Sequence, residues 1–481
     1  MSSPHPAEPV TERSRPEGAR FDAARLRSVV KAYDIRGVVP DQIDAALARE
    51  IGAAFVRVTG AERVVVGHDM RPSSPELVDA FTAGAQAQGA DVIGIGLAST
   101  DQLYYASGAL DCPGAMFTAS HNPARYNGVK LCRAGASPVG QDSGLAEIRD
   151  LLEHGVPPYD GPQGSAEHRD VLGDYAEHLR TLVDVSGIRP LTVVVDAGNG
   201  MACHTVPAVL GDLPLTLVPL YFELDGTFPN HDANPIEPEN LRDLQAAVLE
   251  HGADVGFAFD GDADRCFVVD EQGRTVDPST LTALIAVREL ARHPGAPVIH
   301  NLITSRSVPE VVREHGGTPV RTRVGHTFIK ARMAETGAVF GGEHSGHFYF
   351  RDFWRADSGM LAALHVLAAL GADDRPLSEL LSVYARYVAS GEINSQIADP
   401  AERTAAVRTA FAARPGVTVD GLDGMTVSTE DWWFNLRPSN TEPLLRLNVE
   451  GVDEPTMSAV RDEVLALVRA GTSTTVREGQ R

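Results

Sequence analysis

Short apolar runs alternate with helix-like segments along most of this sequence. Residues 63–67 and 91–96 are apolar runs of strand length, and the dipeptide Ser74-Pro75 between them is typical of a helix start. The alternation starts again after residue 171 and once more after Asp277. Alternating strands and helices are typical of a largely parallel sheet covered by helices. The sequence therefore predicts repeated rounds of one α/β arrangement, without a residue-level repeat between the rounds.

The length of 481 residues exceeds what one hydrophobic core usually serves and suggests about three or four domains. Residues 157–164 are rich in Pro and Gly and suit a boundary. Beyond about residue 390 the predicted strands become shorter, which is typical of an α+β domain. We expect three similar mixed-sheet α/β domains and a smaller C-terminal α+β domain. The predicted ranges are a disordered extension at 1–20, α/β domains at 21–165, 166–274 and 275–389, and an α+β domain at 390–481.

The charge balance limits the classes of partner. Forty-two Lys and Arg against 65 Asp and Glu give a net charge of −23, which argues against nucleic acid or an anionic membrane as a general partner. Nothing in the sequence implies a protein partner. An anionic substrate of such a protein would need Arg and Lys concentrated at its site.

Signals for targeting and disulfides are not found. The Pro-rich first 20 residues have no apolar h-region, and no later apolar run is long enough to span a bilayer. The four cysteines show no CxxC spacing, so buried thiols in a reducing compartment are the default expectation. We therefore expect a cytoplasmic protein.

A polar loop follows the apolar run 115–117. It reads Thr118-Ala-Ser-His-Asn-Pro123 and is followed by Asn127-Gly-Val-Lys130. Loops at strand ends commonly present catalytic groups, so Ser120 is a candidate nucleophile, and Lys130 on the returning strand can point back at it. A desolvated Lys near Mg²⁺ and other cations has a lowered pKa and can exchange a proton with a hydroxyl. From local composition alone, a plain polar turn remains the default interpretation.

Three aspartates alternate with small residues directly after the apolar run 255–259. Carboxylates gathered on one turn repel unless a cation compensates them, and Mg²⁺ prefers such oxygen ligands. An EF-hand would need Gly where Arg265 stands, and flanking helices rather than strands. The remaining alternative is a solvated acidic turn. We predict a magnesium site at Asp260, Asp262 and Asp264.

Two further polar segments contain groups that could bind hydroxyls or an anion. Glu343 and Ser345 lie in a Gly-rich turn and could accept and donate hydrogen bonds to vicinal hydroxyls, although a polar hairpin turn is the simpler interpretation. In the last domain, guanidinium groups lie beside hydroxyl and amide donors, which suits a phosphate dianion. These donors are Arg437, Ser439, Asn440, Thr441 and Arg446.

Four segments in order resemble the α-D-phosphohexomutase family, most closely its phosphomannomutase/phosphoglucomutase branch. They are Tyr33-Asp-Ile-Arg-Gly37 with the serine loop, Asp260-Gly-Asp-Ala-Asp-Arg265, Gly342-Glu-His-Ser-Gly-His347 and Arg437-Pro-Ser-Asn-Thr-Glu-Pro443. The resemblance implies four domains around a central cleft. It also implies that Ser120 is carried as phosphoserine and that one of its phosphate oxygens joins the three aspartates on Mg²⁺.

The resemblance also implies roles for the remaining candidates. Lys130 would do acid/base work, and His326 would contact substrate or carry the proton, whereas His121 would support the loop. Arg36 and Arg265 would stabilise the anionic transition state of phosphoryl transfer. Glu343 and Ser345 would contact sugar hydroxyls, while the donors of the last domain would hold the phosphate that does not react.

The implied activity is reversible interconversion of mannose 6-phosphate and mannose 1-phosphate, with glucose phosphates as further substrates. The reaction would pass through a hexose 1,6-bisphosphate, which would also serve as activator, and the only partners implied are small-molecule hexose phosphates. One alternative is a phosphoglucosamine mutase, against which Asn440 and His344 argue. Two others are a metal-dependent sugar phosphatase using the same serine and a non-catalytic sugar-phosphate sensor.

Overall fold

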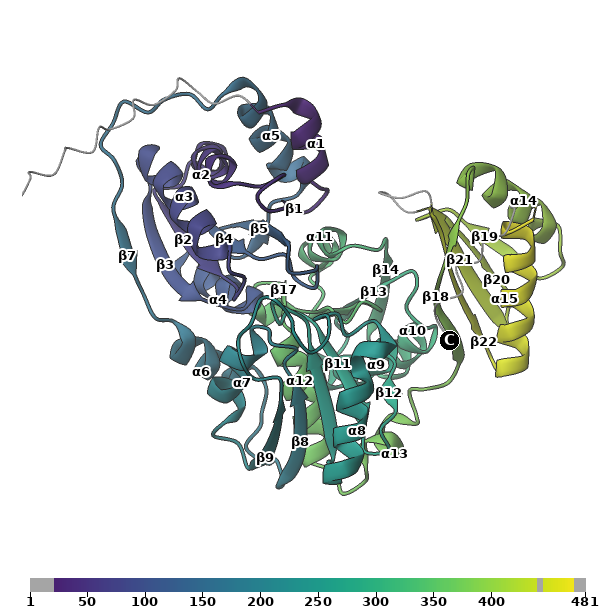
Figure 1. Ribbon diagram of the computed structural model, residues 1–481. Helices are drawn as coiled ribbons and strands as arrows, with labels where there is room; N and C mark the ends of the chain where they lie inside the picture. The colour runs from purple at the N-terminus through teal and green to yellow at the C-terminus, as the bar shows by residue number, and fades with distance from the viewer. Residues whose placement is uncertain (1–20, 439–443, 471–481) are drawn as a thin grey trace, which may run out of the picture.

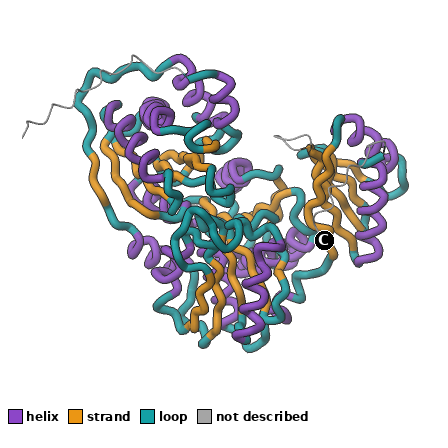
Figure 2. The backbone as a smooth tube through the Cα atoms, in the orientation of Figure 1, coloured by secondary structure: helices purple, strands orange, loops and turns teal. Residues whose placement is uncertain are grey.

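The protein consists of four domains (Figures 1 and 2). A computed structural model describes residues 21–438 and 444–470. The predicted extension at 1–20 lies outside the described residues. Three α/β domains with mixed sheets are followed by a fourth domain with an antiparallel sheet, so the predicted fold class is confirmed. No helix of the described ranges is both long and apolar enough to cross a membrane.

Domain I contains a sheet in the order β1-β5-β4-β2-β3-β7, with β6 paired to β5. Helices α2 and α3 pack against each other on one side of this sheet (Figure 1). The elements are α1 (Ala23–Val29), β1 (Ile35–Val38), α2 (Ala45–Thr59), β2 (Arg63–His68), α3 (Ser74–Ala87), β3 (Asp91–Leu97), α4 (Thr100–Leu110), β4 (Gly114–Phe117), β5 (Tyr126–Arg133), β6 (Ser137–Pro138), α5 (Leu145–His154) and β7 (Ala166–His168).

Domain II contains a five-stranded sheet in the order β12-β11-β10-β8-β9. Its elements are α6 (Leu172–Leu182), β8 (Leu191–Asp196), α7 (Ala202–Leu210), β9 (Leu215–Leu220), α8 (Arg242–His251), β10 (Val255–Phe259), β11 (Cys266–Asp270) and β12 (Thr275–Val276). Because β7 pairs with β3 and β12 pairs with β11, the first two sheets continue two or three residues beyond the predicted boundaries at 165 and 274.

Domain III contains a five-stranded sheet in the order β14-β13-β15-β16-β17. Its elements are α9 (Pro278–Arg292), β13 (Pro297–Asn301), α10 (Ser307–Glu314), β14 (Thr318–Thr322), α11 (His326–Thr336), β15 (Phe340–Gly342), β16 (Phe348–Phe350), β17 (Ala356–Asp357), α12 (Gly359–Gly371) and α13 (Leu377–Leu381). The apolar segment 360–370 forms most of α12, which is buried along its whole length.

Domain IV contains an antiparallel sheet in the order β18-β22-β21-β20-β19, covered by two helices. Its elements are β18 (Val388–Gln396), α14 (Pro400–Ala412), β19 (Thr418–Asp420), β20 (Met425–Ser428), β21 (Trp432–Pro438), β22 (Leu444–Gly451) and α15 (Glu454–Val468). This domain has a core of its own, built around Phe411, Phe434 and Val464.

The first three domains share one strand arrangement. In domain II, β9 and β10 lie on either side of β8, both parallel to it, and β11 returns antiparallel to β10. Strands β2 to β5 of domain I and β13 to β16 of domain III have the same order and directions. The fourth strand must be antiparallel, because the connection after the third strand is too short for a crossover. The serine loop, the acidic turn and the Glu343 turn are therefore topologically equivalent hairpins.

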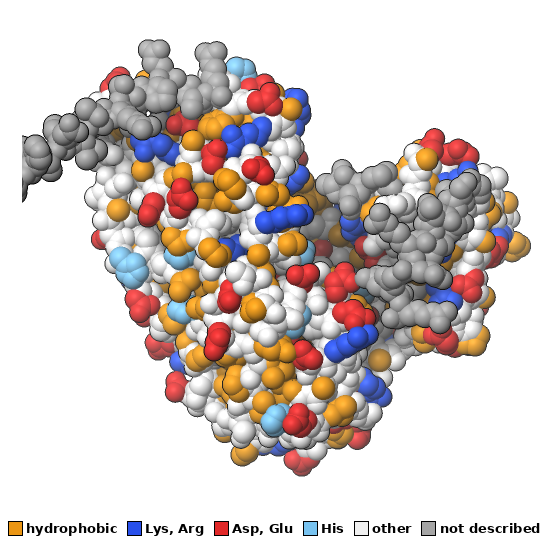
Figure 3. Space-filling view, viewed as in Figure 1, with side chains coloured by type: hydrophobic (Ala, Val, Ile, Leu, Met, Phe, Trp, Pro, Cys, Tyr) orange, Lys and Arg blue, Asp and Glu red, His pale blue; other side chains and the backbone are white. Residues whose placement is uncertain are grey.

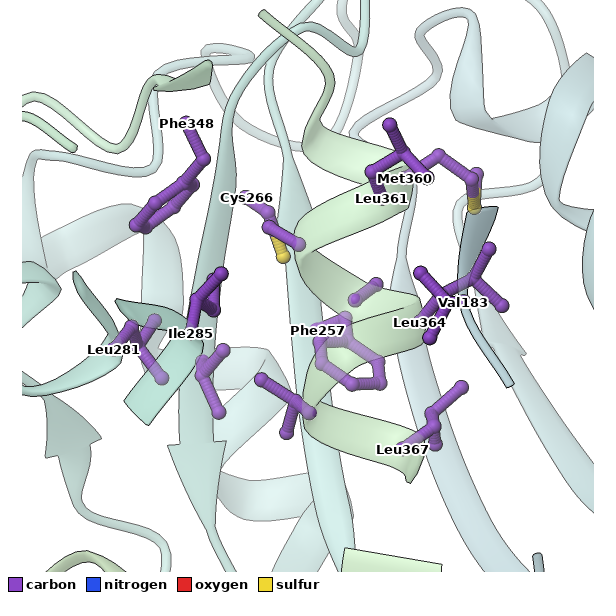
Figure 4. Close-up of a cluster of buried hydrophobic side chains, with 14 of the residues drawn as sticks. Val183, Phe257, Cys266, Leu281, Ile285, Phe348, Met360, Leu361, Leu364 and Leu367 are labelled. Carbon is purple, nitrogen blue, oxygen red and sulfur yellow. The ribbon is translucent and has the colours of Figure 1, made fainter. Parts of the chain in front are cut away.

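Domains II and III are joined by a continuous hydrophobic core (Figure 4). Phe257 and Cys266 of the second sheet face Leu361 and Leu364 of α12, which belongs to domain III. Most of the core of domain I is a separate cluster. The hairpins of domains II and III are therefore held in one rigid unit, against which domains I and IV are placed.

One buried carboxylate joins the first three domains. Asp101, at the start of α4, accepts hydrogen bonds from the hydroxyls of Tyr175 in α6 (2.8 Å) and Ser358 at the cap of α12 (2.6 Å). Burial outweighs these hydrogen bonds and raises the pKa of Asp101 to about 6. The folded protein therefore retains this proton at pH values where the unfolded chain has lost it.

This pKa shift predicts a pH-dependent stability term. As pH rises through the window between the unfolded and folded pKa values, the unfolded chain ionises first, so stability falls. Relative to Asp101→Asn, the wild type should lose about 2 kcal/mol between about pH 4.5 and about pH 7.5. Denaturant unfolding of both proteins at the two pH values measures the difference. A difference that does not change with pH would contradict the prediction.

Candidate functional site

Ser120 lies in the hairpin between β4 and β5 and is 4% exposed. Its backbone has φ of +50°, a left-handed conformation that a serine rarely adopts. Thr118 supports it by accepting a 2.8 Å hydrogen bond from the Ser120 amide. The Ser120 hydroxyl donates to Asp260 Oδ2 at 2.7 Å. The serine of domain I is thus in direct contact with the acidic turn of domain II.

The three aspartates of the acidic turn are fully buried, and carboxylate oxygens of all three lie within 4.8 Å of one another. Burial raises the pKa of Asp260 to about 7, although Arg265 opposes this with a 2.9 Å hydrogen bond. Oδ1 of Asp262 and Oδ1 of Asp264 have no hydrogen-bond partner among the described residues. Clustered buried carboxylates with free oxygens are the donor set that a hard divalent cation requires, so these residues fit the predicted metal site.

Lys130 points from β5 into the acidic turn. Its Nζ lies 2.7 Å from Asp262 Oδ2 and 2.5 Å from Asp264 Oδ2. Burial alone would lower the pKa of Lys130, but the two carboxylates outweigh it and raise the pKa above its ordinary value. The lowered pKa expected for Lys130 beside Mg²⁺ and other cations stays a prediction for the metal-bound site. The ammonium group occupies part of the space in which a metal ion would contact the same oxygens.

Arg36 and His121 lie beside the serine loop, and His326 lines the same cavity as Ser120. Arg36 donates to Asn122 Oδ1 at 2.9 Å, which connects β1 with the serine loop. Nδ1 of His121 lies 3.2 Å from the Ser120 hydroxyl, and burial lowers the pKa of His121. His326 begins α11 in domain III, and burial lowers its pKa to about 3. Both imidazoles are thus neutral near pH 7.

The Glu343 turn connects β15 and β16. Glu343 is buried and accepts hydrogen bonds from the Tyr349 hydroxyl at 2.6 Å and from the Gly325 amide at 3.1 Å. The Ser345 hydroxyl lies 2.9 Å from His347 Nδ1. Glu343 is thus bonded within domain III, so contact with a sugar hydroxyl would require an exchange of partners.

Arg437 of β21 and Arg446 of β22 lie opposite each other in domain IV. Both donate to the Glu392 carboxylate of β18, at 2.9 Å and 3.3 Å respectively. The Nε atoms of both arginines are buried and have no hydrogen-bond partner in the described part of the chain. These groups could serve an anion. The other predicted phosphate donors, Ser439, Asn440 and Thr441, lie outside the described residues.

A cavity of about 550 Å³ connects these groups, and the surface is hollowed between domain I and domain IV (Figure 3). Six of its lining residues are basic and three are acidic, so positive charge is concentrated here on a protein of net charge −23. Glu343 and Ser345 do not line it. The predicted residues that do line it are Arg36, Ser120, Lys130, Asp264, Arg265, His326, Arg437 and Arg446.

The sequence matches models of four domains of one family over almost its whole length. The models describe phosphoglucomutase/phosphomannomutase alpha/beta/alpha domains I, II and III, at residues 27–156, 173–273 and 277–387, and the C-terminal domain, at residues 392–467. The chain belongs to the phosphoglucomutase/phosphomannomutase family. The predicted relationship is thereby confirmed.

Relatives of this family cover nearly the full chain. A phosphomannomutase of Salmonella montevideo is 42% identical over 450 residues, which cover 92% of this chain and 98% of that protein. Phosphohexose mutases of Xanthomonas campestris pv. campestris are 41% identical over 443 residues, covering 92% and 99%. The solved structure of a phosphoglucomutase/phosphomannomutase family protein from Burkholderia thailandensis superposes with a TM-score of 0.84 at 34% identity, covering 93% of this chain and 99% of that one.

The site of this family member includes residues that were not expected from the sequence. The sequence assigns no role to His347, but it lines the cavity, and its Nε2 lies 3.6 Å from Asp264 Oδ1. Lys330 and Asp357 form a buried ion pair of 2.7 Å in domain III. Arg71 and Asp69 lie behind the serine loop. These two directly follow β2, and the carboxyl ends of neighbouring parallel strands meet at one sheet edge, which is the signal that could have identified them.

Proposed function

We propose that the protein catalyses reversible transfer of a phosphoryl group between C6 and C1 of mannose, with glucose phosphates as further substrates. The observation that carries the proposal is that Ser120, hydrogen-bonded to Asp260, shares one cavity with Arg437 and Arg446 of another domain. Such a cavity suits a substrate with a reacting group at one end and a phosphate at the other. The relative from Salmonella montevideo is a phosphomannomutase and those from Xanthomonas campestris pv. campestris are phosphohexose mutases, which supports the proposal.

In the proposed reaction, Ser120 carries the phosphoryl group. The bond between phosphorus and Ser120 Oγ breaks as a bond forms to the free hydroxyl oxygen of the sugar, which loses its proton, and a hexose 1,6-bisphosphate results. After the bisphosphate has turned over, Oγ receives the other phosphoryl group, and a proton returns to the sugar oxygen. Free hexose 1,6-bisphosphate would therefore act as an activator, because it rephosphorylates Ser120.

Charge compensation is the main task of the residues around the serine. Phosphoryl transfer has a highly anionic transition state, which positioned cations stabilise. Arg265 reaches both Asp260 and the Ser120 hydroxyl, its NH2 lying 3.5 Å from Oγ, and Arg36 is held beside the same loop. Asp260, Asp262 and Asp264 would hold Mg²⁺, which supplies further positive charge to the transferred group when bound.

Proton transfer is assigned to Lys130 or His326. The Lys130 ammonium is held protonated by two carboxylates, which suits the acid role, whereas the neutral His326 can accept a hydrogen bond. If the metal ion takes oxygens of Asp262 and Asp264, Lys130 loses partners that raise its pKa. Its proton is then more easily released to or taken from a sugar oxygen.

The far phosphate would be held by Arg437 and Arg446 together with Ser439, Asn440 and Thr441. An incoming phosphate would compete with the Glu392 carboxylate for the two guanidinium groups. Glu343 and Ser345 would orient the sugar hydroxyls from domain III. Recognition from both ends of the cavity allows the sugar to be bound in either direction.

A substrate panel tests the proposal. We expect mannose 6-phosphate and mannose 1-phosphate to be interconverted with Mg²⁺ and a trace of hexose 1,6-bisphosphate, glucose phosphates to react as well, and glucosamine phosphates to react least. Product identity is read by ³¹P NMR. Steady release of inorganic phosphate without a positional isomer would instead indicate a phosphatase, and preference for glucosamine phosphates would indicate a phosphoglucosamine mutase.

A further inference from the structure

We propose that Arg71 is a positioning residue that holds the Ser120 loop in the geometry needed for phosphoryl transfer. The inference rests on the proposed function, because it assigns to Arg71 the placement of the serine that carries the phosphoryl group. Arg71 does not line the cavity, and its guanidinium makes no hydrogen bond to the acidic turn in the described residues. It acts through the backbone carbonyl groups of the loop.

A single guanidinium binds the backbone of the whole loop. Nη2 of Arg71 donates to the carbonyls of Ser120 at 2.8 Å and Asn122 at 2.6 Å. Nη1 donates to the carbonyls of Pro123 at 3.0 Å and Tyr126 at 2.9 Å. The loop residues therefore turn their carbonyl groups inward around one planar fork. Lysine has no such fork and could not satisfy four carbonyls in this arrangement.

The charge of Arg71 is compensated where it is buried. Arg71 is 1% exposed and Asp69 is 0% exposed, and Arg71 Nε donates to Asp69 Oδ2 at 3.1 Å. Asp69 is fixed in turn by the Ser74 hydroxyl, which donates to Oδ1 at 2.7 Å. Removing one partner of a buried ion pair is strongly unfavourable, so this arrangement has one well-defined geometry. The loop is held in a fixed position relative to this ion pair, because its carbonyl groups accept hydrogen bonds from Arg71.

The backbone conformation of Ser120 is strained, so the loop must be stabilised by its surroundings. Its φ of +50° places a non-glycine residue in the left-handed region, which costs about 1 kcal/mol or more and persists only where the surroundings impose it. Arg71 binds the carbonyl of this residue, and Thr118 binds its amide. Both peptide groups of the strained residue are thus fixed, and the hydroxyl is directed at Asp260.

Residues of domain II pack against Arg71 as well. The Phe228 ring lies 5.1 Å from the guanidinium carbon, and a Cβ added at Gly226 would come within 2.6 Å of Arg71 Cα. The acidic turn packs equally closely on the serine loop, since a Cβ at Gly261 would lie 2.4 Å from the Ser120 carbonyl oxygen. Arg71 therefore sets the position of the serine relative to the acidic turn across the domain boundary.

The expected effect of Arg71→Lys is on turnover rather than on substrate binding. Displacing a reacting group by about 1 Å can cost about 100-fold in rate. Arg437 and Arg446, which would bind the far phosphate, lie in another domain and are unaffected. We therefore expect kcat to fall by about 100-fold with KM changed by less than about threefold.

The test compares Arg71→Lys with Tyr175→Phe, which removes a buried hydrogen bond to Asp101 without touching the loop. For both, kcat, KM, the melting temperature and the rate at which hexose 1,6-bisphosphate phosphorylates Ser120, followed by intact mass, are measured. The inference is supported if Arg71→Lys slows turnover and phosphorylation at unchanged KM, while Tyr175→Phe keeps the wild-type kcat. It is overturned if the wild type is phosphorylated and Arg71→Lys is phosphorylated equally fast, or if Tyr175→Phe is slowed as much.

The two remaining outcomes are that Arg71→Lys does not fold and that the wild type gains no phosphate. If Arg71→Lys does not fold, Phe228→Leu, which changes only the far side of the guanidinium, should lower kcat by about tenfold at unchanged KM. A wild-type kcat in that variant then overturns the inference. If the wild type itself gains no phosphate on Ser120, the proposed function has failed, and that result is distinct from a failure confined to Arg71.

Discussion

Replacing Ser120 by alanine is expected to reduce mutase activity by at least about 10⁴-fold, because no phosphoryl group can then be carried by the enzyme. Its hydroxyl is the group of domain I that contacts Asp260, and the neighbouring Thr118 hydroxyl is engaged with the Ser120 amide. Substrate binding should survive, because Arg437 and Arg446, which would hold the phosphate that does not react, lie in domain IV. The rate is measured in a coupled assay, and binding of mannose 1-phosphate by calorimetry.

Ser137→Ala is the matched control, because Ser137 is an exposed serine of the same domain. It should retain wild-type activity and should still gain phosphate from hexose 1,6-bisphosphate, whereas Ser120→Ala should gain none. Activity above about 1% of the wild type in Ser120→Ala would exclude Ser120 as the obligatory phosphoryl carrier. A biological role that survived in Ser120→Ala, without turnover by the wild type, would favour a sugar-phosphate sensor.

The positions of the functional hairpins could be predicted because each follows a short buried strand. Phe117, Phe259 and Phe340 end or begin such strands, and the polar residues after them must lie at the sheet edge. The sequence does not reveal that the three hairpins are topologically equivalent, because this follows from strand order. Strand order depends on contacts between residues far apart in the chain.

The helix α9 shows where periodicity stops being informative. It was not predicted, and its residues from Pro278 to Ala286 are all buried. Since it packs against β15 and α12, it has no exposed face over these residues, and the alternation of exposed polar and buried apolar positions that indicates a surface helix is lacking. The shared core of domains II and III could not be predicted either. Composition and periodicity indicate a domain boundary near residue 274, but they do not show that side chains on both sides of it pack into one core.

Side-chain partners were the least predictable level. Lys130 lies between Asp262 and Asp264, and Glu343 accepts a hydrogen bond from Tyr349, and neither partner is indicated by the sequence around these residues. Residue type and spacing indicate which groups gather in a region. They do not decide which of several polar neighbours a side chain bonds, since this depends on distances of a few tenths of an ångström and on the ligand present.

Removal of divalent metal should have the second-largest effect, lowering the rate by about 10³-fold or more, because three buried carboxylates beside the serine would then oppose an incoming phosphate. Asp260, Asp262 and Asp264 are 0% exposed, and only the ammonium of Lys130 and the guanidinium of Arg265 contact them as cations in the described residues. When Asp260 is ionised, two monovalent cations leave the three carboxylates with excess negative charge, and this excess contributes to the raised pKa of Asp260. Dialysis against a chelator followed by addition of Mg²⁺ should remove and restore activity.

The same charge excess predicts a readout that does not depend on turnover. Mg²⁺ should raise the melting temperature of the wild type, because an ion that binds only the folded state stabilises it. Asp262→Asn should abolish this dependence, since it removes the carboxylate that Lys130 and Thr100 both contact, whereas Asp212→Asn, an exposed change in the same domain, should preserve it. A chelated enzyme with full activity, or a melting temperature that Mg²⁺ does not change, would mean that Lys130 and Arg265 alone neutralise the acidic turn and that the site does not use a metal ion.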